Sequence, residues 1–108
     1  MKLKLFPLLI ALSACNSTSG QIATNENRDF LIRDYVRCNQ FNSTELARKS
    51  GDAYSLAIAA ERRCGKYRSS VLESLASTLG PARAMDFMDR QTQRQIQINA
   101  GMIAELRN

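Results

Sequence analysis

The residues of this chain best suited to chemistry are its three cysteines, Cys15, Cys38 and Cys64. A thiol serves as a nucleophile, a metal ligand or a disulfide partner, and each role needs different neighbours. The chain has no His, so the commonest general base and the commonest neutral metal ligand are both missing. It also has no glycine-rich phosphate loop and no evident pair of catalytic carboxylates. We therefore expect no catalytic residues, no metal site, no cofactor and no enzymatic activity.

Cys15 directly follows an N-terminal segment that has three parts. Lys2 and Lys4 form a short positive region, residues 5–12 are mostly apolar, and Ser13-Ala14 are small. This order is typical of a secretory signal. The apolar run is much shorter than the roughly 20 residues that a membrane-spanning helix needs. The segment therefore predicts export and not a transmembrane anchor.

The four residues Leu12-Ser13-Ala14-Cys15 resemble a lipobox, the processing motif of bacterial lipoproteins. The resemblance implies that residues 1–14 are a lipoprotein signal peptide and that Cys15 becomes the acylated N-terminus. Acyl chains such as palmitate would then hold the protein in a bilayer, and two chains on one residue give stable attachment. A conventional signal peptide that leaves Cys15 as a free thiol is the alternative.

Asn16 stands where an Asp would retain a lipoprotein of enteric bacteria in the inner membrane. The resemblance therefore implies a location on the outer membrane, facing the periplasm. Residues 15–27 are small and polar apart from Ile22, a composition that predicts a flexible linker. Residues 28–108 then form one small domain.

Removal of the signal leaves 13 basic and 10 acidic side chains, a net charge of +3. This mild excess does not suggest a nucleic-acid partner, and it is compatible with weak attraction to anionic polymers of the envelope. Its densest part is a basic cluster around Cys64. A solvated surface explains that cluster, and a binding site for an acidic partner or a lipid phosphate is the alternative. The cluster consists of Arg62, Arg63, Lys66 and Arg68.

Apolar residues at helical spacing predict an all-α fold that begins with two helices, residues 28–50 and residues 52–79. Gly51 lies between them and favours an antiparallel hairpin. A restart signal at Asn42 and a glycine at Gly65 leave open a break at either place.

Cys38 lies thirteen residues before Gly51 and Cys64 lies thirteen residues after it. At 1.5 Å per residue, both stand about 20 Å from the turn and face each other. Two cysteines in an exported protein also favour a disulfide. We therefore predict a Cys38–Cys64 bond; two buried free thiols are the alternative, and a two-cysteine metal site has less support without His.

Gly80-Pro81 predicts the end of the second helix and the start of a third. The apolar pattern of residues 81–108 is loose, since Thr92 and Asn99 interrupt it. This helix is ordinary and frays, or its first half packs while its tail projects, or a partner chain completes its apolar side. The partner-binding residues would then include Met85, Met88, Ile96 and Ile103.

The predicted hairpin resembles small exported bacterial proteins with paired cysteines and no assigned role. The resemblance covers residues 28–79, and it implies a helical fold without implying a function. The residues that carry it are Tyr35, Cys38, Ala57, Ala60 and Cys64.

We expect an envelope lipoprotein that binds the bilayer through acylated Cys15 and is an interaction or structural component, within a secretion or conjugation assembly. Its partner would be another envelope protein. The rival hypothesis is an inhibitor of an envelope-attacking enzyme such as a lysozyme or protease, which needs a rigid protruding loop. A sensor of membrane stress is a third hypothesis, and the oligomeric state is open.

Overall fold

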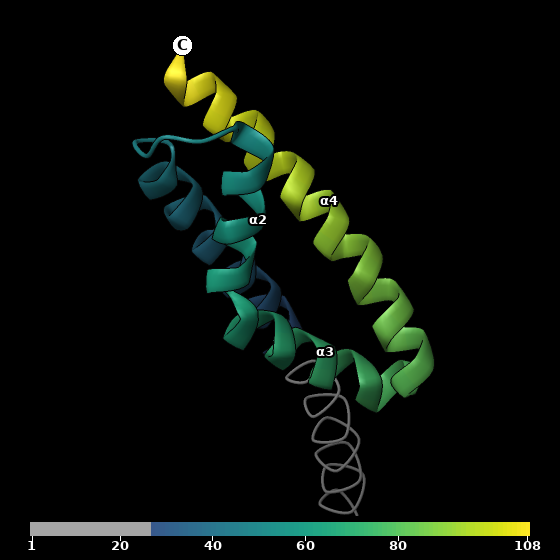
Figure 1. Ribbon diagram of the computed structural model, residues 1–108. Coiled ribbons are helices and arrows are strands. Elements are labelled where there is room, and N and C mark those ends of the chain that lie inside the picture. Colours follow the sequence, from purple (N-terminus) through teal and green to yellow (C-terminus); the bar gives the residue numbers. More distant parts are fainter. Residues whose placement is uncertain (1–26) are drawn as a thin grey trace, which may run out of the picture.

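The computed structural model describes residues 27–108. The predictions for the signal peptide, for Cys15 and for the linker up to residue 26 lie outside this range. Within the range every regular element is a helix, which confirms the all-α prediction. The elements are a helix over residues 27–46, here named the first helix, then α2 (Ala53–Arg63), α3 (Gly65–Leu79) and α4 (Pro81–Arg107) (Figure 1).

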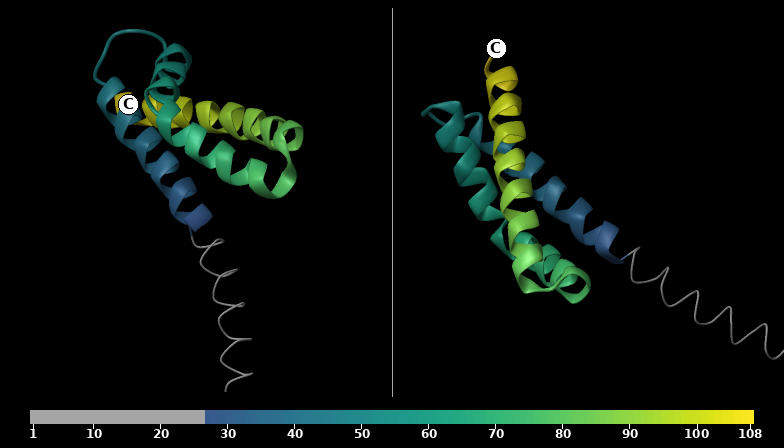
Figure 2. Two further views of the ribbon diagram at one scale, coloured as in Figure 1. Left: turned by 90° about the horizontal axis from the view of Figure 1, so that it is seen from below. Right: turned by 90° about the vertical axis from the view of Figure 1, so that its right-hand side faces the viewer.

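The first helix and α2 run antiparallel, joined by residues 47–52, as the hairpin prediction requires (Figure 1). α3 continues from α2 at an angle, and α4 returns along both of them. Figure 2 shows α3 and α4 side by side, while the first helix crosses this pair at an angle. The C-terminus therefore lies beside the loop at residues 47–52.

The first helix is unbroken at Asn42 and ends at residue 46, four residues before the predicted end. The Asn42 side chain does not cap a new helix; its amide donates to the carbonyl oxygen of Cys38 at 2.9 Å. The loop turns at Gly51, whose φ of 130° disfavours residues with a side chain. Asp52 then caps α2, since its carboxylate accepts from the Ser55 amide at 2.9 Å.

The second predicted helix is interrupted at Cys64, which separates α2 from α3. Of the two breaks that the sequence left open, this one forms, one residue before Gly65. Cys64 has a φ of −100° and a ψ of 15°, outside the helical range, and its amide bonds to the end of α2. Cys64 is also bonded to Cys38, with 5.8 Å between their Cα atoms, so the predicted disulfide is confirmed.

Two apolar clusters form the core, together with a layer of buried polar side chains. One cluster lies near the disulfide and joins the first helix, α3 and α4; its buried members are Tyr35, Cys64, Val71, Leu75, Ala84 and Met88. The other lies between α2 and α4 and contains Ala57, Ile96 and Ile103. Ala57 and Ala60 are fully buried, and their small side chains let α4 approach α2 closely.

The polar layer pairs Asn39 of the first helix with Asn99 of α4, and both side chains are fully buried. The Asn99 amide donates to the side-chain oxygen of Asn39 at 2.8 Å, and Gln95 donates to Asn99 at 3.0 Å. Asn39 in turn donates to the backbone of Tyr35 at 2.9 Å. A buried amide pair of this kind is satisfied in one alignment of the helices, so it fixes their register.

α4 packs along its length and does not project from the fold. Ile103, near its end, is fully buried against α2. Arg107 donates to three carbonyl oxygens of the preceding loop, those of Ala47, Lys49 and Gly51. The structure therefore contains an ordinary third helix, but the predicted fraying is wrong, since α4 stays helical to Arg107, whose side chain holds the preceding loop. Asn99 finds its polar partner within the same chain.

The disulfide closes a long loop, since its two cysteines are 26 positions apart. On the chain-entropy model such a bond contributes about 3 kcal/mol. We expect the double variant Cys38→Ala and Cys64→Ala to lose about that much unfolding free energy in urea denaturation. The matched control is the reduced wild-type protein, which keeps both side chains; equal urea midpoints for the oxidised and reduced forms would contradict this expectation.

Candidate functional site

The four apolar residues expected to bind a partner do not share a surface. Met88, Ile96 and Ile103 are buried in the core of this chain, whereas 56% of Met85 is exposed. A partner therefore has access to Met85 and not to the other three in this structure. Other large apolar side chains of α4 are exposed instead, namely Phe87, Ile98 and Leu106.

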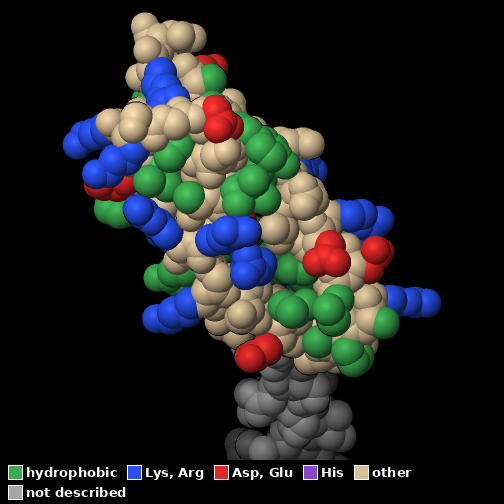
Figure 3. All heavy atoms as spheres, in the orientation of Figure 1, with side chains coloured by type: hydrophobic (Ala, Val, Ile, Leu, Met, Phe, Trp, Pro, Cys, Tyr) green, Lys and Arg blue, Asp and Glu red, His purple; other side chains and the backbone are tan. Residues whose placement is uncertain are grey.

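The four basic residues around Cys64 also separate into two kinds. Arg68 forms an ion pair with Glu61, a carboxylate that is almost fully buried. The Arg68 side chain is still 35% exposed, but its charge is paired with that buried carboxylate, so it is less available to a partner than an unpaired cation. Arg62, Arg63 and Lys66 are exposed. Figure 3 shows Lys and Arg side chains spread over the visible face, on the side along α4 as well as on the opposite side.

Beside the disulfide lies an open hollow of about 470 Å³. Its aromatic walls come from two helices, Phe41 from the first helix and Tyr67 from α3. Arg37 of the first helix brings an exposed cation to the same place. We name this feature the disulfide hollow; its lining residues are Asp34, Arg37, Cys38, Phe41, Asn42 and Tyr67.

Arg63 and Lys66 stand at the rim of the disulfide hollow. The Arg63 guanidinium donates to the side-chain oxygen of Asn42 at 3.4 Å. The Lys66 ammonium lies 5.8 Å from the centre of the Tyr67 ring. In residues 27–108 the ion pairs are Arg68–Glu61 and Arg90–Asp86, so neither Arg63 nor Lys66 is paired with a carboxylate.

The two cysteines bring equivalent neighbours to this hollow. Arg37 precedes Cys38 and Phe41 follows it by three residues; Arg63 precedes Cys64 and Tyr67 follows it by three. The chain thus contains Arg-Cys-x-x-aromatic twice. Joining the cysteines places both arginines and both rings around one hollow.

Sequence reasoning missed Arg37, Phe41 and Tyr67 as site residues. The repeated motif was the signal that could have found them, because helical residues three apart lie on neighbouring parts of one surface. What the motif does not show is that Arg68, next to Tyr67, turns inward to Glu61.

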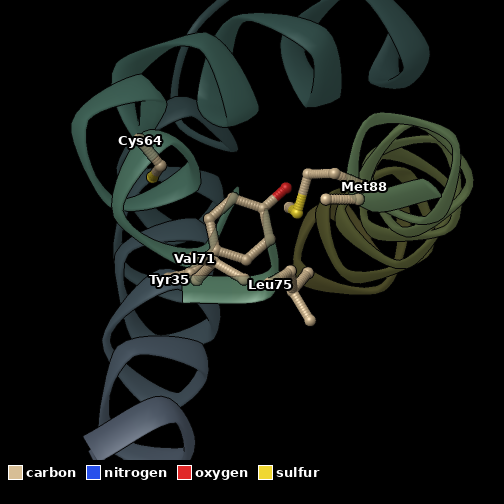
Figure 4. Packing of buried hydrophobic residues seen from close by; sticks show 6 residues of the cluster. Tyr35, Cys64, Val71, Leu75 and Met88 are labelled. Atoms are coloured by element: carbon tan, nitrogen blue, oxygen red, sulfur yellow. The ribbon is translucent and has the colours of Figure 1, made fainter. Parts of the chain in front are cut away.

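Beneath the hollow, Tyr35 connects the first helix to α2. Its hydroxyl donates to one oxygen of Glu61 at 2.9 Å, and Arg68 binds the other oxygen. Figure 4 shows the Tyr35 ring between Cys64 on one side and Met88 on the other. Burial, followed by the negative charge of Glu61, raises the pKa of Tyr35 well above its usual range. The phenol therefore stays protonated and holds Glu61 in place.

This arrangement suits binding. It offers cations and aromatic rings on the surface, above an interior carboxylate that two donors already satisfy. In residues 27–108 no three His, Cys, Asp or Glu side chains are grouped closely enough to hold a metal ion. None of the helices in that range is both long and apolar enough to cross a membrane.

Comparisons of the chain with protein-family models, with curated proteins and with solved structures found no match. The assignment of a function therefore depends on the residues and geometry described above.

Tyr35 makes stability depend on alkaline pH. A raised pKa in the folded state leaves the unfolding free energy unchanged below pH about 10, the usual pKa of tyrosine, and lowers it as the pH rises further. Tyr35→Phe should lose about 2 kcal/mol at neutral pH, because a buried Glu61 oxygen loses its donor. The unfolding free energy of Tyr35→Phe should also decline less than that of the wild type between about pH 9 and about pH 11, the range in which tyrosine ordinarily titrates.

The measurement is urea denaturation across this range, and the matched control is Tyr54→Phe, which changes an exposed tyrosine of α2. Indistinguishable stabilities for the two variants at neutral pH would show that the Tyr35–Glu61 bond is not important to the fold.

Proposed function

We propose that this protein is a lipid-anchored envelope protein that acts through binding, as an interaction or structural component within a secretion or conjugation assembly. Cys15 is the attachment point, the outer membrane is the location, and the helical domain faces the periplasm. The partner is another protein of the envelope. No catalytic step is part of the proposal.

The Cys38–Cys64 bond is the observation that carries the proposal. A structural disulfide is characteristic of exported proteins, in agreement with the secretory signal. Because Cys38 and Cys64 are bonded to each other, neither is available to a lipid or to Cys15. The third cysteine is the one within the lipobox-like residues 12–15. Acylation of Cys15 therefore accounts for all three cysteines.

Exposed apolar side chains support a binding role. Phe41 is 66% exposed and Ile98 is 50% exposed, on different helices. Within residues 27–108 the buried side chains of Asn39, Asn99 and Glu61, by contrast, have partners inside the fold, and the Ser43 hydroxyl is the buried side-chain group without one. The domain thus combines an interior held by specific hydrogen bonds with exposed apolar side chains that a partner could cover.

The rival function, inhibition of an envelope-attacking enzyme, has one observation in its favour. Residues 48–52 form an exposed loop at one end of the hairpin. Arg107 holds that loop from below by donating to the carbonyl oxygens of Ala47, Lys49 and Gly51. An inhibitor needs a short loop held in one conformation, because ordering a loop upon binding weakens affinity.

The anchor is tested by the intact mass of the protein isolated from membranes, with and without reduction and alkylation. We expect a chain that begins at Cys15, carries acyl groups, and takes up alkylating reagent at Cys38 and Cys64 only after reduction. Cys15→Ser is the control, since it should remove the acyl mass and leave the disulfide. An unlipidated wild-type chain would overturn the anchored function and leave an exported domain.

The binding role is tested by photo-crosslinking in cells. A photoreactive residue at Met85 or Ile98 samples α4, and one at Arg48 or Ser50 samples the loop. Deleting the end of α4 is not a usable alternative, because it would remove Ile103 from the core. We expect adducts with an envelope protein from α4. Adducts from the loop alone, with a hydrolytic enzyme, would establish the inhibitor instead.

A further inference from the structure

We propose that the disulfide hollow is a docking surface for an anionic phospholipid membrane. Arg37, Arg63 and Lys66 bind headgroup phosphates, while Phe41 and Tyr67 enter the interfacial layer. The membrane is the one to which Cys15 attaches the chain, so this inference rests on the proposed function and specifies how its domain is oriented.

The charge of the hollow favours an anionic occupant. Arg63 donates to a neutral amide, and Lys66 lies near a neutral ring. Asp34 is the carboxylate among the lining residues, against three cations in the lining and at the rim. Each Lys or Arg close to an anionic bilayer strengthens attachment, and three acting together give a substantial attraction.

The aromatic walls favour a membrane over a small anion. The hollow is open and its rings are exposed, 66% for Phe41 and 36% for Tyr67. Basic and aromatic side chains side by side suit the boundary between headgroups and acyl chains, where rings are covered and charges stay hydrated. Phe41 has no evident role inside the fold, so contact with a bilayer would account for its exposure.

The position of the hollow along the chain places it within reach of the bilayer. Eleven residues separate Cys15 from Asn27, the first described residue. Even a fully extended chain of that length spans at most about 40 Å. Arg37 follows ten residues later on the first helix, about 15 Å along its axis. Attachment at Cys15 would keep the local concentration of headgroups high, so weak contacts would suffice.

The test uses the processed full chain, residues 15–108, carrying Cys15→Ser, so that an acyl anchor cannot hide the contact. Binding is measured by co-sedimentation with vesicles of phosphatidylcholine alone and with vesicles in which about one third is phosphatidylglycerol. We expect binding to the anionic vesicles only, weakening as salt screens the charges.

The decisive variant is Arg37→Gln, Arg63→Gln and Lys66→Gln together, at three exposed positions. At about fivefold per cation near the surface, the loss in vesicle affinity should be roughly 100-fold. The matched control is Arg83→Gln, Arg90→Gln and Arg94→Gln on α4, which removes the same charge from exposed positions elsewhere. We expect the control to lose only a few-fold, through the lower net charge.

A second pair of variants tests the aromatic contact without changing charge. Phe41→Ser should weaken binding several-fold, whereas Tyr54→Ser, at an exposed ring of α2, should not. Circular dichroism and the intact disulfide confirm that each variant is folded.

Three results would overturn the proposal. Equal losses for the two triple variants would show a general charge effect. Equal binding to neutral vesicles would show an apolar contact that needs no cations. Binding to polyglutamate but to no vesicle, abolished by the Arg37 triple variant, would assign the hollow to an acidic protein segment. None of these results bears on acylation of Cys15, which the intact mass tests separately.

Discussion

The disulfide between Cys38 and Cys64 joins the middle of the first helix to the residue at which the second helical run is interrupted. α3 leaves Cys64 in a new direction, and this lets α4 pack against both α2 and α3 on its return. The same bond holds Tyr35, one turn before Cys38, beside Glu61, one turn before Cys64. This one disulfide therefore supports the bend at Cys64, the Arg68–Glu61 ion pair and the disulfide hollow.

Specific polar contacts fix the alignment of the helices, which the small apolar core alone would not. A domain of about this size buries a modest apolar area, so its helices could slide past one another at little cost. Asn39 and Asn99 are fully buried and satisfy each other across two helices. At the ends of the bundle, Arg107 holds the hairpin loop, and Arg28 donates to Ser74 and Thr78 near the end of α3. These contacts are satisfied together in one alignment, which gives a small protein a defined shape.

The disulfide hollow also depends on the Cys38–Cys64 bond. Each cysteine is preceded by an arginine and followed three residues later by an aromatic residue. Bonding the cysteines therefore brings two arginines and two rings together in one place, while the charge of Arg68 is paired with Glu61. Thus the bond that stabilises the domain also assembles the surface on which the proposed membrane contact depends.

Local patterns in the sequence were sufficient to predict three helical runs, the hairpin that turns at Gly51, the Cys38–Cys64 pairing and the start of the last helix at Pro81. These features depend on local periodicity, on glycine and proline, and on equal distances from one turn. The apolar stripes also indicate roughly which side of each helix is buried, but the packing of the helices was needed to choose between neighbouring positions on a stripe. The spacing of Met85 and Met88 does not distinguish them, yet α4 turns Met88 inward and leaves Met85 exposed. Likewise Arg68 belongs to the basic cluster in sequence, and only the bend at Cys64 brings it to a buried carboxylate. In the sequence Asn99 only interrupts an apolar stripe. In the structure it bonds to Asn39, sixty positions earlier in the chain. Such pairings depend on distances between helices, which local spacing does not contain.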